Sequence, residues 1–173
     1  EVFDMCNKKL ADKRFSVKNI IKNSGVEVVC TTDDPADSLN YHKQIAADKS
    51  FGVKVLPTFR PDKAVHIENE AFIPYLAQLS DVSGVSVKSA ADLLDALKIR
   101  LNYFAEFGCF IADHALADYT FADYTVEEAD VIFQKRIAGK AITEAEIEIF
   151  QTFLLVELGK EYCKRGMTMQ LHA

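Results

Sequence analysis

Several residue types and patterns are scarce in this sequence, and each absence narrows what the chain can be. It has no tryptophan and only seven glycines and four prolines among 173 residues, and it contains no linker rich in glycine, proline or serine. Its four cysteines form no Cys-x-x-Cys pair and no zinc-ligand spacing. No apolar run reaches the length of a membrane span. No run of lysine and arginine occurs, and the net charge is −6, so we expect no nucleic acid and no membrane among its partners.

The composition that remains is typical of a globular protein. Apolar residues make up 49% of the chain and charged residues 27%, which is enough for one domain with a real core. We interpret the cysteines as small buried thiols of a reducing compartment, and we expect a cytoplasmic protein. The chain begins at Glu1 without a methionine and stops directly after a strand-like run, so we expect a piece of a longer protein.

Four strand-like runs alternate with helical patterns along the chain. The runs cover residues 26–32, 53–59, 109–113 and 167–172, and residues 1–25 form a helical lead-in. Strands that alternate with helices predict an α/β fold whose parallel strands are joined by right-handed crossovers. The helical patterns span residues 16–25, 34–49, 71–80, 87–108, 125–138 and 143–165.

Side chains that cap helices mark several of the predicted helix starts. Asp34 precedes Pro35, a favoured residue at the first helical position. Thr143 and Glu146 have the spacing of a capping box. Pro74 is expected to interrupt the short helix that contains it. The predicted caps are Ser16, Asp34, Ser86 and Thr143.

Period-two alternation gives each predicted strand one apolar face and one mixed face. The mixed face ends in a polar or charged residue in every strand, and these residues are Asp33, Arg60, Asp113 and His172. Functional groups at the carboxyl ends of strands, above a mixed inner face, are typical of a (β/α)8 barrel. A doubly wound sheet also binds ligands there, but its strands are buried on both faces. Lys54 and Thr168 fit such burial poorly, and no glycine-rich phosphate loop follows a strand. We therefore predict part of a barrel.

Four segments carry a resemblance to a known family. In order, they are "VVCTTDDPADSLNYH", "VLPTFRPDK", "IADHAL" and "GMTMQLH". Together they resemble uronate isomerase (glucuronate isomerase), in the amidohydrolase superfamily, and the resemblance runs from about Phe3 to His172. It implies a (β/α)8 TIM barrel with a helical insertion. It also implies an intramolecular oxidoreductase that interconverts D-glucuronate with D-fructuronate and D-galacturonate with D-tagaturonate.

The resemblance assigns roles to three of the strand-end residues. Arg60 corresponds to a substrate-binding arginine at the end of the third barrel strand. Asp113, from the fourth strand, and His172, from the fifth, correspond to catalytic polar residues. Asp33 is a substrate-binding candidate, although hydrogen bonding at the barrel mouth explains it equally well. From the residues alone, Arg60 could instead be a surface arginine paired with Asp62.

The family's other site residues have no counterpart in the chain. The metal-binding His-x-His of the first barrel strand is absent, and the aspartate of the eighth strand would lie beyond Ala173. The resemblance therefore implies a single segment, residues 1–173, with four parallel strands equivalent to barrel strands two to five, about half a barrel. We expect it to hold no metal and to be inactive alone. In the intact enzyme it leaves room for a divalent metal such as zinc, a small-molecule sugar acid as ligand, and a homo-oligomer.

Two other functions remain open on the sequence. One is a metal-dependent hydrolase of the amidohydrolase type, although "IADHAL" has no lysine that could bridge two metal ions. The other is a non-catalytic domain that binds sugar acids or a partner protein. The strand-end residues are the ones through which any of these functions would act.

Overall fold

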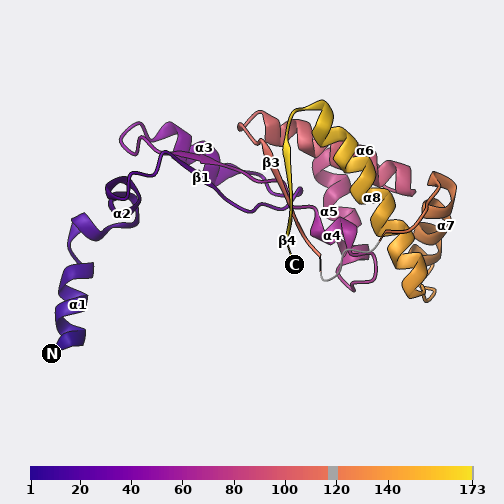
Figure 1. Ribbon diagram of the computed structural model, residues 1–173, viewed down its shortest axis with the longest axis horizontal. Coiled ribbons are helices and arrows are strands. Elements are labelled where there is room, and N and C mark those ends of the chain that lie inside the picture. Colours follow the sequence, from indigo (N-terminus) through magenta and orange to yellow (C-terminus); the bar gives the residue numbers. More distant parts are fainter. Residues whose placement is uncertain (117–120, 173) are drawn as a thin grey trace. The chain divides into compact units, whose positions relative to one another are not determined.

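The computed structural model describes residues 1–116 and 121–172 (Figure 1). These residues belong to two compact units. The N-terminal unit comprises Glu1–Thr31 and Leu39–Leu56, and the C-terminal unit comprises Thr32–Ser38 and Pro57–Ala173. In the part of the chain that the structure describes, no helix is both long and apolar enough to cross a membrane.

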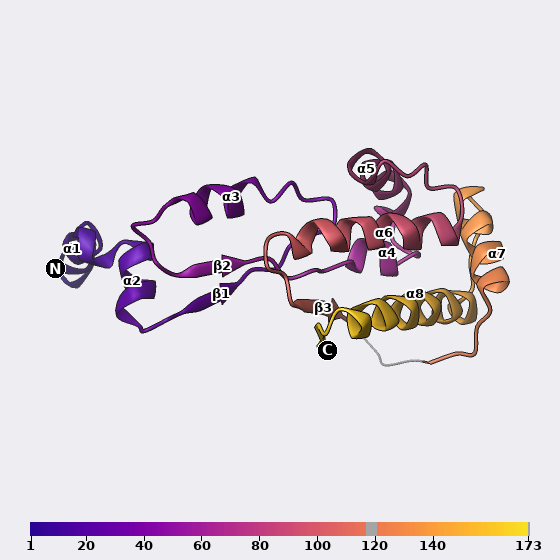
Figure 2. The same cartoon turned by 90° about the horizontal axis from the view of Figure 1, so that it is seen from above.

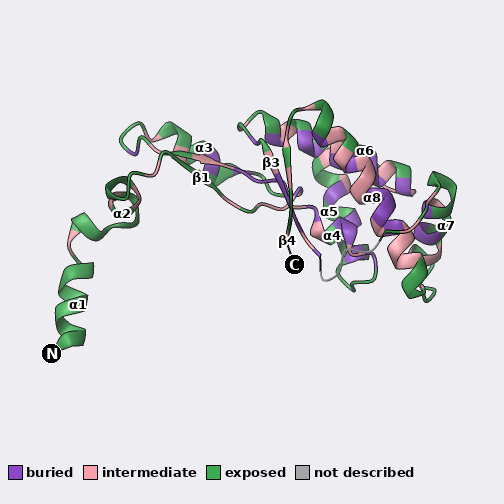
Figure 3. Ribbon diagram, viewed as in Figure 1, coloured by how far each residue is buried: buried purple, intermediate pink, exposed green. Residues whose placement is uncertain are grey.

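The N-terminal unit consists of short helices and one pair of parallel strands. Ser16 caps α2 as predicted, because its side chain accepts a hydrogen bond from the backbone N–H of Asn19. The strands β1 and β2 pair in parallel, with Val28 opposite Lys54. Every residue of α1 is exposed (Figure 3). The elements are α1 (Val2–Leu10), η1 (Lys13–Phe15), α2 (Val17–Asn23), β1 (Val28–Cys30), α3 (Asn40–Ala47) and β2 (Lys54–Leu56).

The helix predicted from residue 34 begins later, at Asn40, so the assignment of Asp34 as its cap is wrong. The Asp34 carboxylate instead accepts from the backbone N–H of Ala36 at 2.8 Å. The backbone N–H of Asp37 closes a turn on the carbonyl oxygen of Asp34, also at 2.8 Å. An Asp-Pro sequence suits such a turn as well as it suits a helix start, and here the turn forms.

The C-terminal unit holds most of the helices. The capping box of Thr143 and Glu146 is present. Ser89, not Ser86, caps α6. Pro74 does not interrupt α5, because it occupies the first turn, where the missing N–H has no helical partner to lose. The elements are α4 (Asp62–Val65), α5 (Phe72–Ser83), α6 (Ala90–Ala105), β3 (Ile111–Ala115), α7 (Val126–Ile137), α8 (Glu144–Lys164) and β4 (Thr168–His172).

Strand pairing in the C-terminal unit is parallel. β3 pairs with β4, and Ala112 lies opposite Met169. Parallel bridges join Asp33 to Phe59 and Phe59 to Ala112. The row therefore runs from Asp33 through Phe59 and Ala112 to Met169, in chain order. The predicted α/β class with parallel strands is confirmed.

Helices α6 and α8 cover the apolar face of this row. The Phe59 ring makes edge contacts with Phe104 of α6 at 5.2 Å and Tyr162 of α8 at 6.3 Å between centroids. Phe59 and Ala112 are fully buried. Figure 2 shows α6 and α8 side by side, and they are in contact. The apolar alternation predicted for these strands thus gives the packed face.

The prediction of buried cysteines is wrong for three of the four. Cys109 is buried, but Cys6, Cys30 and Cys163 are exposed. Cys30 is the last residue of β1, in which Val28 and Cys30 are exposed and Val29 is half-buried. Alternation in a two-stranded pair therefore does not ensure burial as it does under the helices of the C-terminal unit.

His114 is a buried residue of the helix-covered face. Its ring centroid lies 5.7 Å from that of Tyr162 in α8, and its exposed fraction is zero. Among the described residues, neither ring nitrogen has a hydrogen-bond partner. Burial lowers the pKa of His114 from the ordinary 6.5 to about 4.

This buried imidazole should make the fold acid-sensitive. Because only the unfolded state gains the proton readily, stability is full above pH 6.5 and falls as the pH drops toward the lowered pKa. One pKa unit corresponds to about 1.4 kcal/mol, so the loss at pH 4 is about 3 kcal/mol. Urea unfolding of the wild type and of His114→Phe at pH 7 and pH 4 should show this loss only in the wild type. An equal loss in both proteins would contradict the assignment.

Candidate active site

Arg60 stands where the second strand segment ends. Its backbone N–H donates to the carbonyl oxygen of Asp33 at 3.0 Å, and Pro61, which has no N–H, then stops the pairing. The Arg60 Nε donates to Asp62 Oδ2 at 2.6 Å, and Nη1 lies 3.6 Å from Asp113 Oδ2. These carboxylates, Asp62 first, raise the pKa of Arg60. The pairing with Asp62 suggested by the sequence is present, and the guanidinium also reaches a second carboxylate.

Asp113 and His172 form a hydrogen-bonded pair beside Arg60. Asp113 lies in β3 and is only 6% exposed. His172 is the last residue of β4, and its Nδ1 lies 2.8 Å from Asp113 Oδ1. The other ring nitrogen, Nε2, is 3.5 Å from Arg60 Nη2. Arg60, Asp113 and His172 therefore form a cluster, here called the strand-end triad.

The triad has the geometry of an oriented base beside a cation. An ionised Asp113 accepts the proton on His172 Nδ1, and the lone pair on Nε2 then faces Arg60 Nη2 at 3.5 Å. The His172 side chain is 43% exposed, so a ligand can reach that nitrogen. Arg60 offers donors that match a carboxylate group. The arrangement can bind an anionic molecule and take up a proton from it.

Asp33 is placed differently from the other three predicted residues. The parallel bridge pairs Asp33 with Phe59 and not with Arg60. The alternation in the sequence, which puts Asp33 and Arg60 on the same face, is therefore wrong by one residue. Its Oδ2 accepts from the backbone N–H of Thr58 at 3.3 Å. It lines an open hollow of about 270 Å³ together with Thr32, Asp34, Arg60, Asp62 and Lys63. Hydrogen bonding at the strand ends, one of its two predicted roles, is present.

Two residues near the triad were missed as functional candidates. Asp62 Oδ1 accepts from the backbone N–H of Ala115 at 3.3 Å. His66, which the sequence suggests is a surface residue, is partly buried, with Nε2 3.2 Å from the carbonyl oxygen of Ala115. The Arg-Pro-Asp segment indicates a role for Asp62, because it places a carboxylate two residues after Arg60, within reach of its guanidinium. Nothing in the sequence pointed to His66.

The triad does not suit a metal ion. Within residues 1–116 and 121–172, no group of three His, Cys, Asp or Glu side chains could hold one. Asp113 and His172 bond to each other, and the Arg60 cation beside them would repel a second cation.

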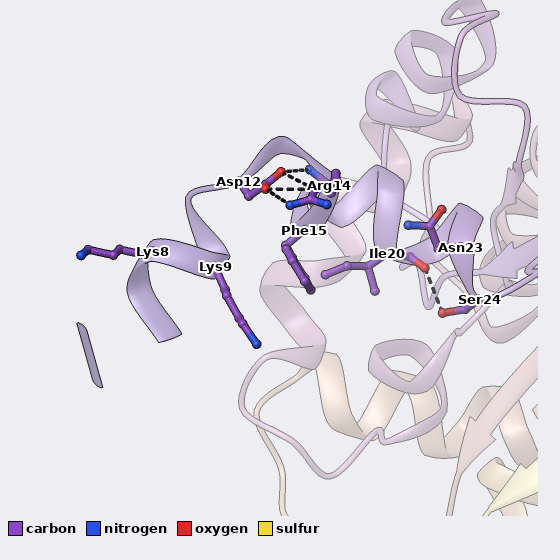
Figure 4. A pocket seen from close by; sticks show the side chains of 8 residues that line it. All are labelled: Lys8, Lys9, Asp12, Arg14, Phe15, Ile20, Asn23 and Ser24. Atoms are coloured by element: carbon purple, nitrogen blue, oxygen red, sulfur yellow. Dashed lines mark hydrogen bonds and ion pairs between the residues drawn. The ribbon is translucent and has the colours of Figure 1, made fainter. Parts of the chain in front are cut away.

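A larger hollow, of about 630 Å³, lies in the N-terminal unit (Figure 4). Its only charged pair with direct contact, Arg14 and Asp12, is joined at 2.6 Å. Lys8 extends away from it in Figure 4. Because mostly exposed side chains line this hollow, it has less of the fixed geometry that catalysis needs. The lining residues are Lys8, Lys9, Asp12, Arg14, Phe15, Ile20, Asn23 and Ser24.

Comparison with known proteins decides the family. A sequence model described as "Glucuronate isomerase" matches residues 1–173. The chain belongs to this family. It is 50% identical over 172 residues to the uronate isomerase of Lachnospira eligens, covering 99% of the chain and 37% of that protein. It is 49% identical to the uronate isomerase of Lachnoclostridium phytofermentans, with the same coverage. The chain thus spans little more than a third of these glucuronate isomerase relatives.

Two solved structures of family members share its fold. The uronate isomerase of Thermotoga maritima superposes with a TM-score of 0.85 and 30% identity, over 90% of this chain and 34% of that one. The glucuronate isomerase of Caulobacter crescentus gives a TM-score of 0.88 and 27% identity, over 98% and 35%. The resemblance seen in the sequence is confirmed.

Proposed function

We propose that this chain is part of an aldose–ketose isomerase that interconverts D-glucuronate with D-fructuronate and D-galacturonate with D-tagaturonate. The observation that carries the proposal is the strand-end triad, which joins a cation and an oriented histidine at the carboxyl ends of parallel strands. The family match supports the substrate class, because a uronate differs from a neutral hexose by a carboxylate that a cation can recognise.

In this proposal each residue of the triad has a different role. Arg60 binds the carboxylate of the sugar acid through two parallel hydrogen bonds. His172 Nε2 takes up a proton at the reacting carbon or hydroxyl, and Asp113 holds the ring in the required tautomer and stabilises the imidazolium that forms. Asp33 lines the entrance to the site, where its carboxylate accepts a hydrogen bond from the backbone N–H of Thr58. The electrophile that polarises the carbonyl oxygen of the substrate then comes from the part of the intact enzyme outside this chain.

The wider setting follows from the same family assignment. The parallel row from Asp33 through Phe59 and Ala112 to Met169 supports a segment of a (β/α)8 barrel. A divalent metal in the intact enzyme would take its ligands from outside this chain, because the triad does not suit one. Free thiols at all four cysteines are compatible with a cytoplasmic location.

A graft tests the proposal directly. The aligned segment of the Lachnospira eligens uronate isomerase is replaced by this chain, and turnover of D-glucuronate is measured. Since the two segments are 50% identical, we expect the graft to isomerise D-glucuronate, while the isolated chain does not. A graft that folds by circular dichroism but shows no turnover, beside an active parent, would refute the proposal and favour a non-catalytic domain.

A further inference from the structure

Within the described part of the chain, the end of β3 has no backbone partner on one edge. Toward the second strand segment, Phe59 N–H donates to the Ile111 carbonyl oxygen at 3.0 Å, and Asp113 N–H donates to the Phe59 carbonyl oxygen at 2.9 Å. A parallel ladder would continue two residues on, from Ala115 N–H to residue 61. The carbonyl oxygen of Pro61 is taken by Ala64 N–H at 2.8 Å as α4 begins. The ladder therefore stops one step short of Ala115.

Side chains at and just after α4 occupy the missing positions. Asp62 Oδ1 accepts the Ala115 N–H at 3.3 Å. His66 Nε2 lies 3.2 Å from the Ala115 carbonyl oxygen and can donate to it. Both backbone groups of Ala115 are thus matched on this edge by side chains instead of a strand. On the other edge, Leu116 N–H donates to the His172 carbonyl oxygen at 3.0 Å.

Asp62 also connects this strand end to the triad. Its second oxygen, Oδ2, accepts from Arg60 Nε at 2.6 Å. Ala115 is the register partner of His172, and Asp113 lies two residues before Ala115. One carboxylate therefore fixes the guanidinium of Arg60 relative to the two strands that carry Asp113 and His172.

His66 can donate to Ala115 as the neutral tautomer with its proton on Nε2, and its charged form can donate to Glu68 as well. Its Nδ1 lies 3.0 Å from Glu68 Oε1, so both ring nitrogens face acceptors, and only the imidazolium donates to both. The groups that face it are Glu68, Asp62 and the Gln151 amide of α8, which lies 3.4 Å from Nδ1. The hydrogen bond to Glu68 is the main cause that raises the pKa of His66.

We infer that Asp62 and His66 are positioning residues. Their side chains take the place of the strand backbone that would otherwise bond to Ala115, and they thereby fix Arg60, Asp113 and His172 relative to one another. The effect on catalysis rests on the proposed function. The hydrogen bonds to Ala115 do not, and they can be tested in the 173-residue chain itself. Asp62→Asn keeps one acceptor oxygen, enough for Arg60 or for Ala115 but not for both, whereas Asp62→Ala keeps none.

The first test is amide hydrogen exchange at Ala115 in the 173-residue chain. Asp62→Ala should accelerate exchange at the Ala115 N–H about tenfold or more, the effect of losing one hydrogen bond to a charged group. His66→Ala removes the donor to the Ala115 carbonyl oxygen, so it should instead shift the carbonyl 13C resonance of Ala115. Asp12→Ala is the matched control, because Asp12 pairs with Arg14 at the same two-residue spacing on an exposed surface. It should leave Ala115 unchanged. Unchanged exchange at Ala115 in Asp62→Ala would overturn the inference whether or not the protein is an isomerase.

The second test is kinetic and uses the graft. Because Arg60 would bind the substrate carboxylate in both ground and transition states, Asp62→Asn should raise KM for D-glucuronate about 10-fold or more and lower kcat less. Asp62→Glu should recover part of the loss, whereas Asp12→Asn should have wild-type constants. An active graft whose KM does not change in Asp62→Asn would reject the positioning role. An inactive wild-type graft would instead reject the proposed function, and the exchange result would still decide the inference.

Discussion

Asp113→Asn in the graft should lower kcat on D-glucuronate by about 100- to 10,000-fold, the range expected when a general base is disabled. The variant keeps the size of the side chain, so the fold should survive. Its amide can donate to His172 Nδ1, and the ring proton then moves to Nε2, the nitrogen that should act as base. Asp113 Oδ1 is 2.8 Å from His172 Nδ1, so this tautomer change follows directly from the substitution.

Two further variants make the Asp113 result specific. His172→Asn should reduce kcat to a similar degree, since it removes the base itself. Asp130→Asn is the matched control, because Asp130 accepts a hydrogen bond from the backbone N–H of Ala90 at 2.9 Å and is not a member of the triad. It should keep wild-type kcat. A folded Asp113→Asn variant with wild-type kcat would show that His172 needs no carboxylate and would remove the Asp–His pair from the mechanism.

Arg60→Lys should lower kcat/KM on D-glucuronate by about 10- to 150-fold. Lysine keeps the charge but loses the two parallel hydrogen bonds, and a hydrogen bond to a charged group contributes about 1.5–3 kcal/mol. Arg60→Met should lower it further, because it leaves the substrate carboxylate unpaired and also removes the cation between Asp62 and Asp113. Steady-state kinetics on both variants, with circular dichroism to confirm folding, provide the measurement.

A matched arginine controls for the loss of a surface ion pair. Arg14 pairs with Asp12 at 2.6 Å, as Arg60 pairs with Asp62 at 2.6 Å, but its side chain is 81% exposed. Arg14→Met should therefore have no measurable effect on kcat/KM. If Arg60→Met also stays folded and keeps wild-type kcat/KM, Arg60 is a surface residue and does not bind the substrate carboxylate.

Period-two alternation along the chain predicts which face of a strand a residue occupies, but not how that strand aligns with its neighbour. Arg60, Asp113 and His172 each follow an apolar, period-two pattern, and this pattern suffices to place them at carboxyl ends on one face. The same reasoning was out of step for Asp33, because alternation within a strand does not fix its register with the next strand. Register depends on hydrogen bonds between segments, and here they align Asp33 with Phe59.

Local helix signals were decisive only where nothing competed with them. Ser16 and Thr143 cap their helices as their sequences predict, since a cap needs only its own first turn. Asp34 has the same chemistry, but its carboxylate closes a turn before the helix begins. Both outcomes satisfy the side chain locally, so the sequence could not choose between them.

The α/β class, the family and the strand-end positions of Arg60, Asp113 and His172 can be predicted from the chain alone, because period-two patterns and long specific segments do not depend on how the chain folds. The contacts that surround these three residues depend on the folded state. Asp62 and His66 reach Ala115, which lies about fifty residues further along the chain, because Pro61 ends one strand while its neighbour continues. An unpaired backbone position of this kind arises only once the strands have paired, and no spacing in the sequence predicts which side chains will bond to it.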